Sequence, residues 1–167
     1  MELDLTVDRM TAADWEAVRK IYKEGIDTGD ATFESSVPDW EQWNAAHVPK
    51  CRLVARENGV VLGWAALSPV SSRKVYGGVA EVSIYVAANA RRRGVGTLLL
   101  ENLVVESEQA GIWTLQAAMF PENKSSFWLH RDAGFRTVGS RERLGCTESG
   151  RWRDVVLMER RSSITGV

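Results

Sequence analysis

The pattern of hydrophobic and polar residues in the first half of the chain predicts two helices between strands. Residues 3–10 alternate between polar and apolar and indicate a strand, whereas apolar residues recur with helical spacing over 11–25 and 37–48. Two apolar runs then fill 52–70, and the Asn58-Gly59 pair between them is a strong signal for a hairpin turn. Antiparallel strands are therefore expected in this half.

The second half of the chain alternates strands with helices. We expect strands over 79–86, 113–120, 135–145 and 151–161, and helices from 94 to about 110 and over 121–134. The complete order implies an α/β (α+β) fold with a mixed central sheet of about seven strands, flanked by about four helices. The sheet is expected to be antiparallel early and to gain crossover helices late.

Composition narrows the class of protein without indicating an activity. The chain has 167 residues and a formal net charge of −1, which fits one domain over 1–167 with a core to about residue 160 and a short C-terminal tail. This charge gives no field that draws the protein to nucleic acid or anionic lipid, so neither is expected as a partner. Two cysteines without ligand spacing predict no metal site and favour the cytoplasm. No signal peptide or membrane span is expected.

Residues 91–97, Arg-Arg-Arg-Gly-Val-Gly-Thr, lie between a predicted strand and a predicted helix. Free N–H groups and the helix dipole favour an anion at such a helix start, and two glycines leave the backbone open to it. No lysine follows Gly96 as in a phosphate loop, and Leu99 stands where the dinucleotide fingerprint needs a small residue. A solvated basic turn stays open as the alternative.

Two motifs resemble those of the GCN5-related N-acetyltransferase (GNAT) superfamily. Residues 91–96 are similar to its Gln/Arg-x-x-Gly-x-Gly/Ala turn, and 123–135 are similar to its Asn-x-x-Ser helix that continues into Leu-His/Tyr-x-x-x-Gly-Phe. The resemblance implies acetyl-CoA as co-substrate and a splayed strand pair that holds the coenzyme. The coenzyme-binding residues that it implies are Ile84, Tyr85, Val86, Arg91, Arg92, Arg93, Gly94, Val95, Gly96, Thr97, Asn123, Ser126 and His130.

Within the superfamily, the stretches 31–43, 71–76, 80–86 and 150–160 resemble the phosphinothricin and methionine sulfoximine acetyltransferase branch. The resemblance implies a homodimer that acetylates the free amine of a small amino acid or analogue by direct attack in a ternary complex. The substrate-binding residues expected from it are Phe33, Glu34, Arg73, Tyr76, Glu81 and Ser83.

Acetyl transfer to an amine requires a base that takes the proton of the amine and a donor for the thioester oxygen. Strand alternation places Glu81, Ser83 and Tyr85 on one face, and the resemblance makes Glu81 the catalytic base. It also implies that the backbone of 84–86 contacts the pantetheine arm and polarises the thioester. An amino-acid carboxylate suits Arg73, because a guanidinium binds a carboxylate through two hydrogen bonds.

Plainer interpretations of these residues stay open. Asn123 can be a helix N-cap, His130 a packed histidine, and Glu81 a solvent-facing carboxylate paired with Arg73. Three other functions also stay open. They are acetylation of a peptide, polyamine or aminoglycoside amine, binding of coenzyme A without catalysis, and nucleic-acid binding that rests on residues 91–93.

Overall fold

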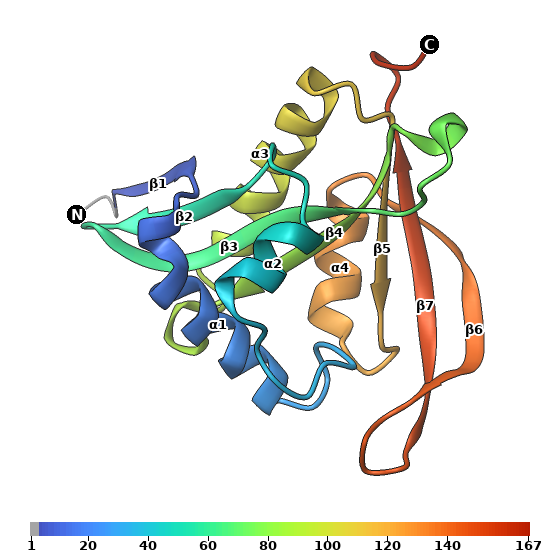
Figure 1. Ribbon diagram of the computed structural model, residues 1–167, viewed down its shortest axis with the longest axis horizontal. Helices are drawn as coiled ribbons and strands as arrows, with labels where there is room; N and C mark the ends of the chain where they lie inside the picture. The colour runs from blue at the N-terminus through green and yellow to red at the C-terminus, as the bar shows by residue number, and fades with distance from the viewer. Residues whose placement is uncertain (1–3) are drawn as a thin grey trace.

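A computed structural model describes residues 4–167, and Figure 1 shows it as a ribbon. The described residues form the strands β1 (Leu5–Arg9), β2 (Leu53–Glu57), β3 (Val60–Pro69), β4 (Val79–Val86), β5 (Thr114–Met119), β6 (Arg136–Cys146) and β7 (Trp152–Arg161). They also form the helices α1 (Trp15–Asp27), α2 (Trp40–Ala46), α3 (Val95–Gln109) and α4 (Lys124–Asp132). The predicted order of elements is confirmed. Residue 3, where the predicted first strand begins, lies outside the described residues.

The strands form one mixed sheet in the order β1-β2-β3-β4-β5-β7-β6. The pairs from β1 to β4 are antiparallel, β4 and β5 run parallel, and β7 pairs antiparallel with both β5 and β6. The Asn58-Gly59 turn between β2 and β3 has the positive φ angles, 50° and 79°, that its sequence predicts. The expected mixed sheet, antiparallel at its start, is confirmed.

Helices cover both faces of the sheet, with α1 and α2 in front of it and α3 and α4 behind it in Figure 1. Trp64 of β3 packs on the front face, where its ring centroid lies 5.6 Å from those of Tyr22 in α1 and Trp43 in α2. A Cβ on the preceding Gly63 points to the other face and meets side chains of α3. The alternation of β3 therefore divides the core into an aromatic layer in front and an aliphatic layer behind.

The first helix continues to Asp27, two residues beyond the end that Gly25 predicts. A Cβ at Gly25 would lie 2.6 Å from the ring of Tyr85. This glycine is therefore required for the close approach of α1 to β4, and it does not end the helix.

The sheet splits between β4 and β5. The two strands pair only from Val79 to Glu81 and from Thr114 to Gln116. Beyond these residues β4 stays with β3, and β5 stays with β7. The splayed strand pair expected from the sequence is confirmed, and its opening positions the candidate site.

Candidate active site

A cleft of about 1050 Å³ opens where β4 and β5 separate. Its walls are the splayed strands, the loop after α1, the starts of α3 and α4, and the turn that precedes α3. We call residues 28–34 the acceptor loop and residues 91–94 the anion turn. The cleft brings together most of the residues expected from the sequence: Phe33, Glu34, Glu81, Ser83, Ile84, Tyr85, Val86, Arg91, Arg92, Gly94, Val95, Gly96, Thr97, Asn123, Ser126 and His130.

The anion turn has the backbone geometry of an anion site. Arg92 and Gly94 both adopt the left-handed conformation, with φ of 62° and 80°, and α3 begins at Val95. Among residues 4–167 no side chain caps the start of α3, so its first N–H groups are available to a ligand. Two left-handed residues just before a helix start leave its N–H groups open at a concave turn, which suits a phosphate group.

The three arginines of this segment have different environments. Arg91 and Arg92 line the cleft, whereas Arg93 lies outside its lining and pairs with Glu57 at the end of β2. Lys124, at the start of α4, adds a third cation to the cleft wall. The expectation that Arg93 contacts the coenzyme therefore receives no support from its position.

The start of α4 shows that capping and cleft lining occur together. Asn123 is the N-cap, because its side-chain oxygen accepts a hydrogen bond from the N–H of Ser126 at 3.3 Å. Its side-chain amide donates to the carbonyl of Asp30 in the acceptor loop at 3.3 Å. The open alternative of an N-cap at Asn123 is thus correct, and the same residue also joins the two walls of the cleft.

His130 lies at the base of the cleft and is only 2% exposed. Its Nδ1 lies 2.8 Å from the carbonyl oxygen of Ser126, which can only accept, so Nδ1 carries the proton. Burial lowers the pKa of His130, and the ring is therefore neutral near pH 7. Its Nε2 is then an acceptor, and this buried atom has no partner among residues 4–167. An unsatisfied buried acceptor suits a ligand that brings a donor.

Glu81 stands at the fork of the two splayed strands, next to the last paired residue of β5. Its Oε1 accepts a hydrogen bond from Nε2 of Gln116 at 2.9 Å, and the two residues are register partners across the fork. Within the described residues Glu81 is not paired with Arg73, contrary to the plainer interpretation. One carboxylate oxygen is thus held in place while the residue lines the cleft.

An aromatic wall lies farther along the same face of β4, four residues beyond Glu81. The ring of Tyr85 stacks on Tyr22 at 4.9 Å and on Trp64 at 5.0 Å. Burial raises the pKa of Tyr85, and burial together with the charge of Glu34 raises the pKa of Tyr22 to about 12. Both hydroxyls are therefore protonated at neutral pH and are uncharged donors beside the acceptor loop.

Arg73 and Tyr76, expected at the substrate, do not line this cleft. They lie in the connection from β3 to β4, where the guanidinium of Arg73 is 5.3 Å from the ring centroid of Tyr76. The structure therefore separates these two residues from Phe33 and Glu34, which do line the cleft.

Several residues in or near the cleft are not expected from the sequence, and three of them have polar side chains that act on the site. Lys124 and Gln116 contribute as described above, and Arg153 of β7 holds the acceptor loop from beneath. Lys124 follows the Asn123 signal directly and could have been included. Gln116 carries no local signal, because its partner lies 35 residues away. Arg153 lies in the stretch 150–160 that resembles the branch, but nothing in that stretch indicates its partner 124 residues away.

The forked parallel strand pair, the uncapped helix start beside it and the carboxylate at the fork form the α/β arrangement expected of an acyltransferase. Residues 15–135 match the family model described as "Acetyltransferase (GNAT) family". The chain belongs to the GNAT family and is an acetyltransferase, as its sequence motifs predict.

The chain is similar to characterised relatives and to solved structures over most of its length. It is 35% identical to a phosphinothricin N-acetyltransferase of Alcaligenes faecalis over 88% of this chain and 77% of that protein. It is 29% identical to an L-methionine sulfoximine/L-methionine sulfone acetyltransferase of Pseudomonas aeruginosa, over 88% of each. A phosphinothricin acetyltransferase of Sinorhizobium meliloti, solved in complex with AcCoA, matches with a TM-score of 0.86 and 30% identity. That match covers 97% of this chain and 90% of that one.

Residues 4–167 contain no group of three or more His, Cys, Asp and Glu side chains that could hold a metal ion. None of the helices in the same range is both long and apolar enough to cross a membrane.

Proposed function

We propose that the protein transfers the acetyl group of acetyl-CoA to the free amine of a small amino acid or analogue, of the phosphinothricin or methionine sulfoximine type. The observation that carries the proposal is the position of Glu81 at the fork of β4 and β5, in the cleft that the anion turn and the acceptor loop also line. The names of the two relatives described above support the class of acceptor.

The residues present fit acetyl-CoA. The uncapped start of α3 and the cations Arg91, Arg92 and Lys124 would hold its phosphates. The edge of β4 beyond Glu81 has no paired strand on its β5 side, so backbone groups of 84–86 are available to its amide arm. The unpartnered Nε2 of His130 suits a donor of that arm. When bound, acetyl-CoA supplies an activated acetyl thioester.

Glu81 acts as the base in this proposal. Its carboxylate takes a proton from the ammonium of the acceptor, so that the neutral amine attacks the thioester carbonyl directly in a ternary complex. The C–S bond breaks, and CoA leaves as the free thiol with the second proton of the amine nitrogen. Gln116 fixes one carboxylate oxygen and leaves the other free for the proton. In this proposal His130 contacts the coenzyme and does not donate a proton in the reaction, because its Nδ1–H donates a hydrogen bond to the carbonyl of Ser126.

Phe33, Glu34, Ser83, Arg73 and Tyr76 are proposed to contact the acceptor. The first three line the cleft. Among residues 4–167 the guanidinium of Arg73 forms no ion pair and lies over the ring of Tyr76, which leaves it available for an amino-acid carboxylate. An acceptor that lacks a carboxylate, such as a polyamine or an aminoglycoside, would gain nothing from Arg73 and is the alternative.

A thiol-release assay tests the function. Acetyl-CoA is offered with phosphinothricin, methionine sulfoximine, common amino acids, a polyamine, an aminoglycoside and a peptide. We expect turnover with the first two and a loss of about 10²- to 10⁴-fold in kcat for Glu81→Gln, with an unchanged Kd for CoA by calorimetry. Full turnover of this variant at neutral pH would contradict the base assignment. Coenzyme binding without thiol release from any amine would show a non-catalytic module.

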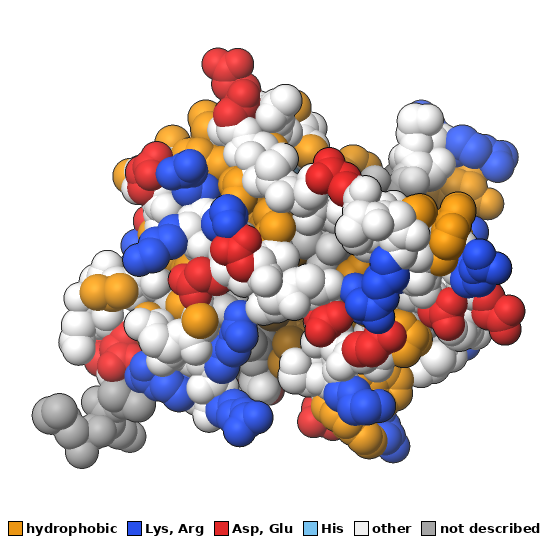
Figure 2. Space-filling view, turned by 90° about the horizontal axis from the view of Figure 1, so that it is seen from below, with side chains coloured by type: hydrophobic (Ala, Val, Ile, Leu, Met, Phe, Trp, Pro, Cys, Tyr) orange, Lys and Arg blue, Asp and Glu red, His pale blue; other side chains and the backbone are white. Residues whose placement is uncertain are grey.

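We further propose a single domain over 1–167 that forms a homodimer in the cytoplasm and binds neither nucleic acid nor membranes. Val138, Leu144 and Trp152 are exposed apolar residues of the terminal hairpin β6–β7, which favours a contact there. Basic and acidic side chains are mixed over the face in Figure 2, which argues against a nucleic-acid patch on that face. Light scattering in solution tests the dimer.

A further inference from the structure

Arg153 lies beneath the acceptor loop and outside the lining of the cleft. It extends from β7, and its side chain is only 2% exposed. One Nη donates to the carbonyl of Gly29 at 2.7 Å, and the other donates to the carboxylates of Asp30 at 2.9 Å and Glu122 at 3.2 Å. A single guanidinium thus joins the acceptor loop, the connection from β5 to α4, and β7.

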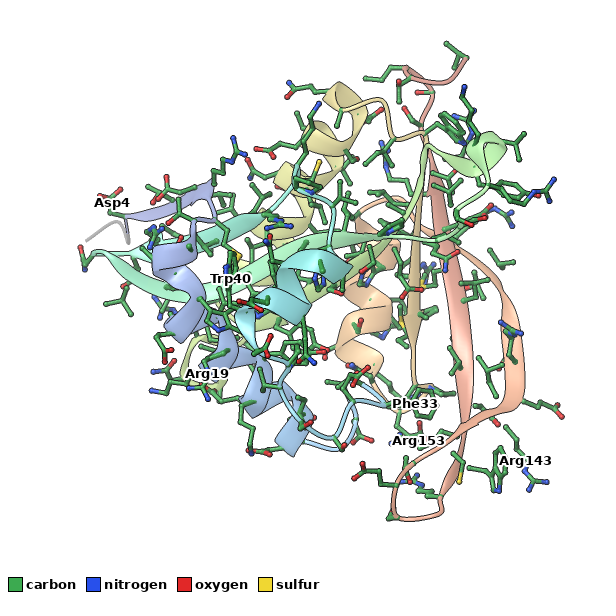
Figure 3. The ribbon with its side chains drawn as sticks, viewed as in Figure 1. Asp4, Arg19, Phe33, Trp40, Arg143 and Arg153 are labelled. Atoms are coloured by element: carbon green, nitrogen blue, oxygen red, sulfur yellow. The ribbon has the colours of Figure 1, made fainter. Side chains whose placement is uncertain are left out.

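An aromatic stack extends the same contact to the far end of the acceptor loop. The guanidinium carbon of Arg153 lies 3.8 Å from the ring centroid of Phe120, which meets the ring of Phe33 edge-on at 4.8 Å. Phe33 is packed against Gly145 of β6, where a Cβ would lie 2.6 Å from its ring. Figure 3 shows the labelled side chains of Arg153 and Phe33 near each other at the lower end of β7.

The energetics favour one position of the loop. A buried guanidinium is costly unless its donors are satisfied, and its three acceptors come from Gly29, Asp30 and Glu122. A shift of the acceptor loop would break two of these hydrogen bonds at once. A further side-chain hydrogen bond, from Asn123 at the start of α4 to the carbonyl of Asp30 in the loop, is long at 3.3 Å.

We propose that Arg153 is a positioning residue that fixes the acceptor loop over the amine end of the cleft and thereby sets the KM for the amine. It does so through Phe33 and Glu34, which line the cleft on this loop. Arg153 has no hydrogen bond to the anion turn or to α3, and it reaches the start of α4 only through Glu122, so we expect coenzyme binding to depend on it far less than the position of the loop does. The inference about KM rests on the acetyl-transfer function proposed above.

The test compares Arg153→Met and Arg153→Lys with the control Arg151→Met. Methionine removes the buried charge, and the carboxylates left behind are about half exposed, at 51% and 52%, so neither becomes a buried unpaired charge. Lysine keeps the charge but loses the planar fork and the stack on Phe120. Arg151 faces solvent and lies 3.8 Å from the same Glu122, so it is a matched control for the charge near that carboxylate.

We expect Arg153→Met to raise the KM for the amine by about ten- to hundredfold through misplacement of the loop, while kcat at saturation and the Kd for CoA each stay within about twofold of wild type. The KM of Arg153→Lys should lie between those of wild type and Arg153→Met, and the KM of Arg151→Met should match that of wild type. Hydrogen–deuterium exchange of residues 28–34, measured without any substrate, should accelerate in the same order. Asp30→Ala, which removes one partner and keeps the buried arginine, should raise exchange in this loop as well.

Unchanged exchange in residues 28–34 of Arg153→Met would overturn the inference, and so would an equal loss of affinity for CoA and amine. If the wild-type protein transfers acetyl to no amine, the proposed function fails. The exchange experiment then still decides whether Arg153 fixes the loop.

Discussion

Alanine in place of Gly94 tests the anion turn, because the same helix offers a matched control at its other end. Gly94 precedes α3 and Gly111 follows it, and both have a φ of 80°. A Cβ added at either position meets no atom within 4 Å. The two substitutions therefore impose the same backbone strain without a steric clash, but only Gly94 lines the cleft.

The expected loss of stability follows from the backbone alone. A left-handed conformation costs a residue with a Cβ about 1–2 kcal/mol, and the reduced freedom of the unfolded chain offsets about 0.4–1 kcal/mol. Each variant should therefore lose about 1 kcal/mol of unfolding free energy. In a domain of this size that loss lowers the Tm by about 2–4 °C.

Affinity for CoA should separate the two variants. The strain at residue 94 is relieved by rotation of the anion turn, which turns an N–H donor away from the phosphate. A hydrogen bond to a charged group contributes about 1.5–3 kcal/mol, so the Kd of Gly94→Ala should rise about ten- to hundredfold. Gly111→Ala should keep the wild-type Kd. Urea denaturation and titration calorimetry with CoA measure the two quantities.

Equal affinity of both variants for CoA, at equal loss of stability, would refute the assignment of the pyrophosphate to the anion turn. A much larger loss of stability in Gly94→Ala than in Gly111→Ala would refute the strain calculation, since the two glycines share their φ angle and their open surroundings.

Two further predictions concern charge. Arg91→Met should weaken CoA binding and reduce its dependence on salt, whereas Arg93→Met should leave both unchanged because Arg93 pairs with Glu57; calorimetry at two ionic strengths distinguishes them. Burial lowers the pKa of both His130 and His47, so the unfolded chain takes up protons that the folded chain does not. Unfolding free energy should therefore decline as the pH falls below about 6.5 and level off below the folded pKa values. In urea titrations His130→Gln should flatten part of this decline, and an unaltered pH profile would contradict the neutral buried ring.

The fold could be predicted because its signals are local. Alternation, helical spacing and the Asn58-Gly59 turn each act within a few residues, and the observed order of elements follows them. The end of α1 could not be predicted in this way. Gly25 is a helix-stop signal in the sequence, but its role is set by the Tyr85 ring of a strand about 60 residues later.

The coenzyme half of the site is equally local. The anion turn and the start of α4 are contiguous segments, and residues within each of them determine its backbone geometry. These residues are Gly94 in the turn and Asn123 at the start of α4. Most of the residues expected there line the cleft. The exception is Arg93, which forms an ion pair with Glu57 of β2. No local pattern in the sequence predicts this pair, because the two residues are far apart along the chain.

The acceptor half depends on contacts between distant segments. Glu81 is oriented by Gln116 across the fork, Phe33 is held by Phe120, and Asp30 is held by Arg153. None of these pairs can be found before the register of the strands and the course of the acceptor loop are known. The motifs of a sequence in this family therefore predict where the coenzyme binds better than which amine is acetylated. Acceptor specificity in this protein should consequently respond to substitutions at positions such as 116 and 153, which lie outside both motifs and outside the anion turn.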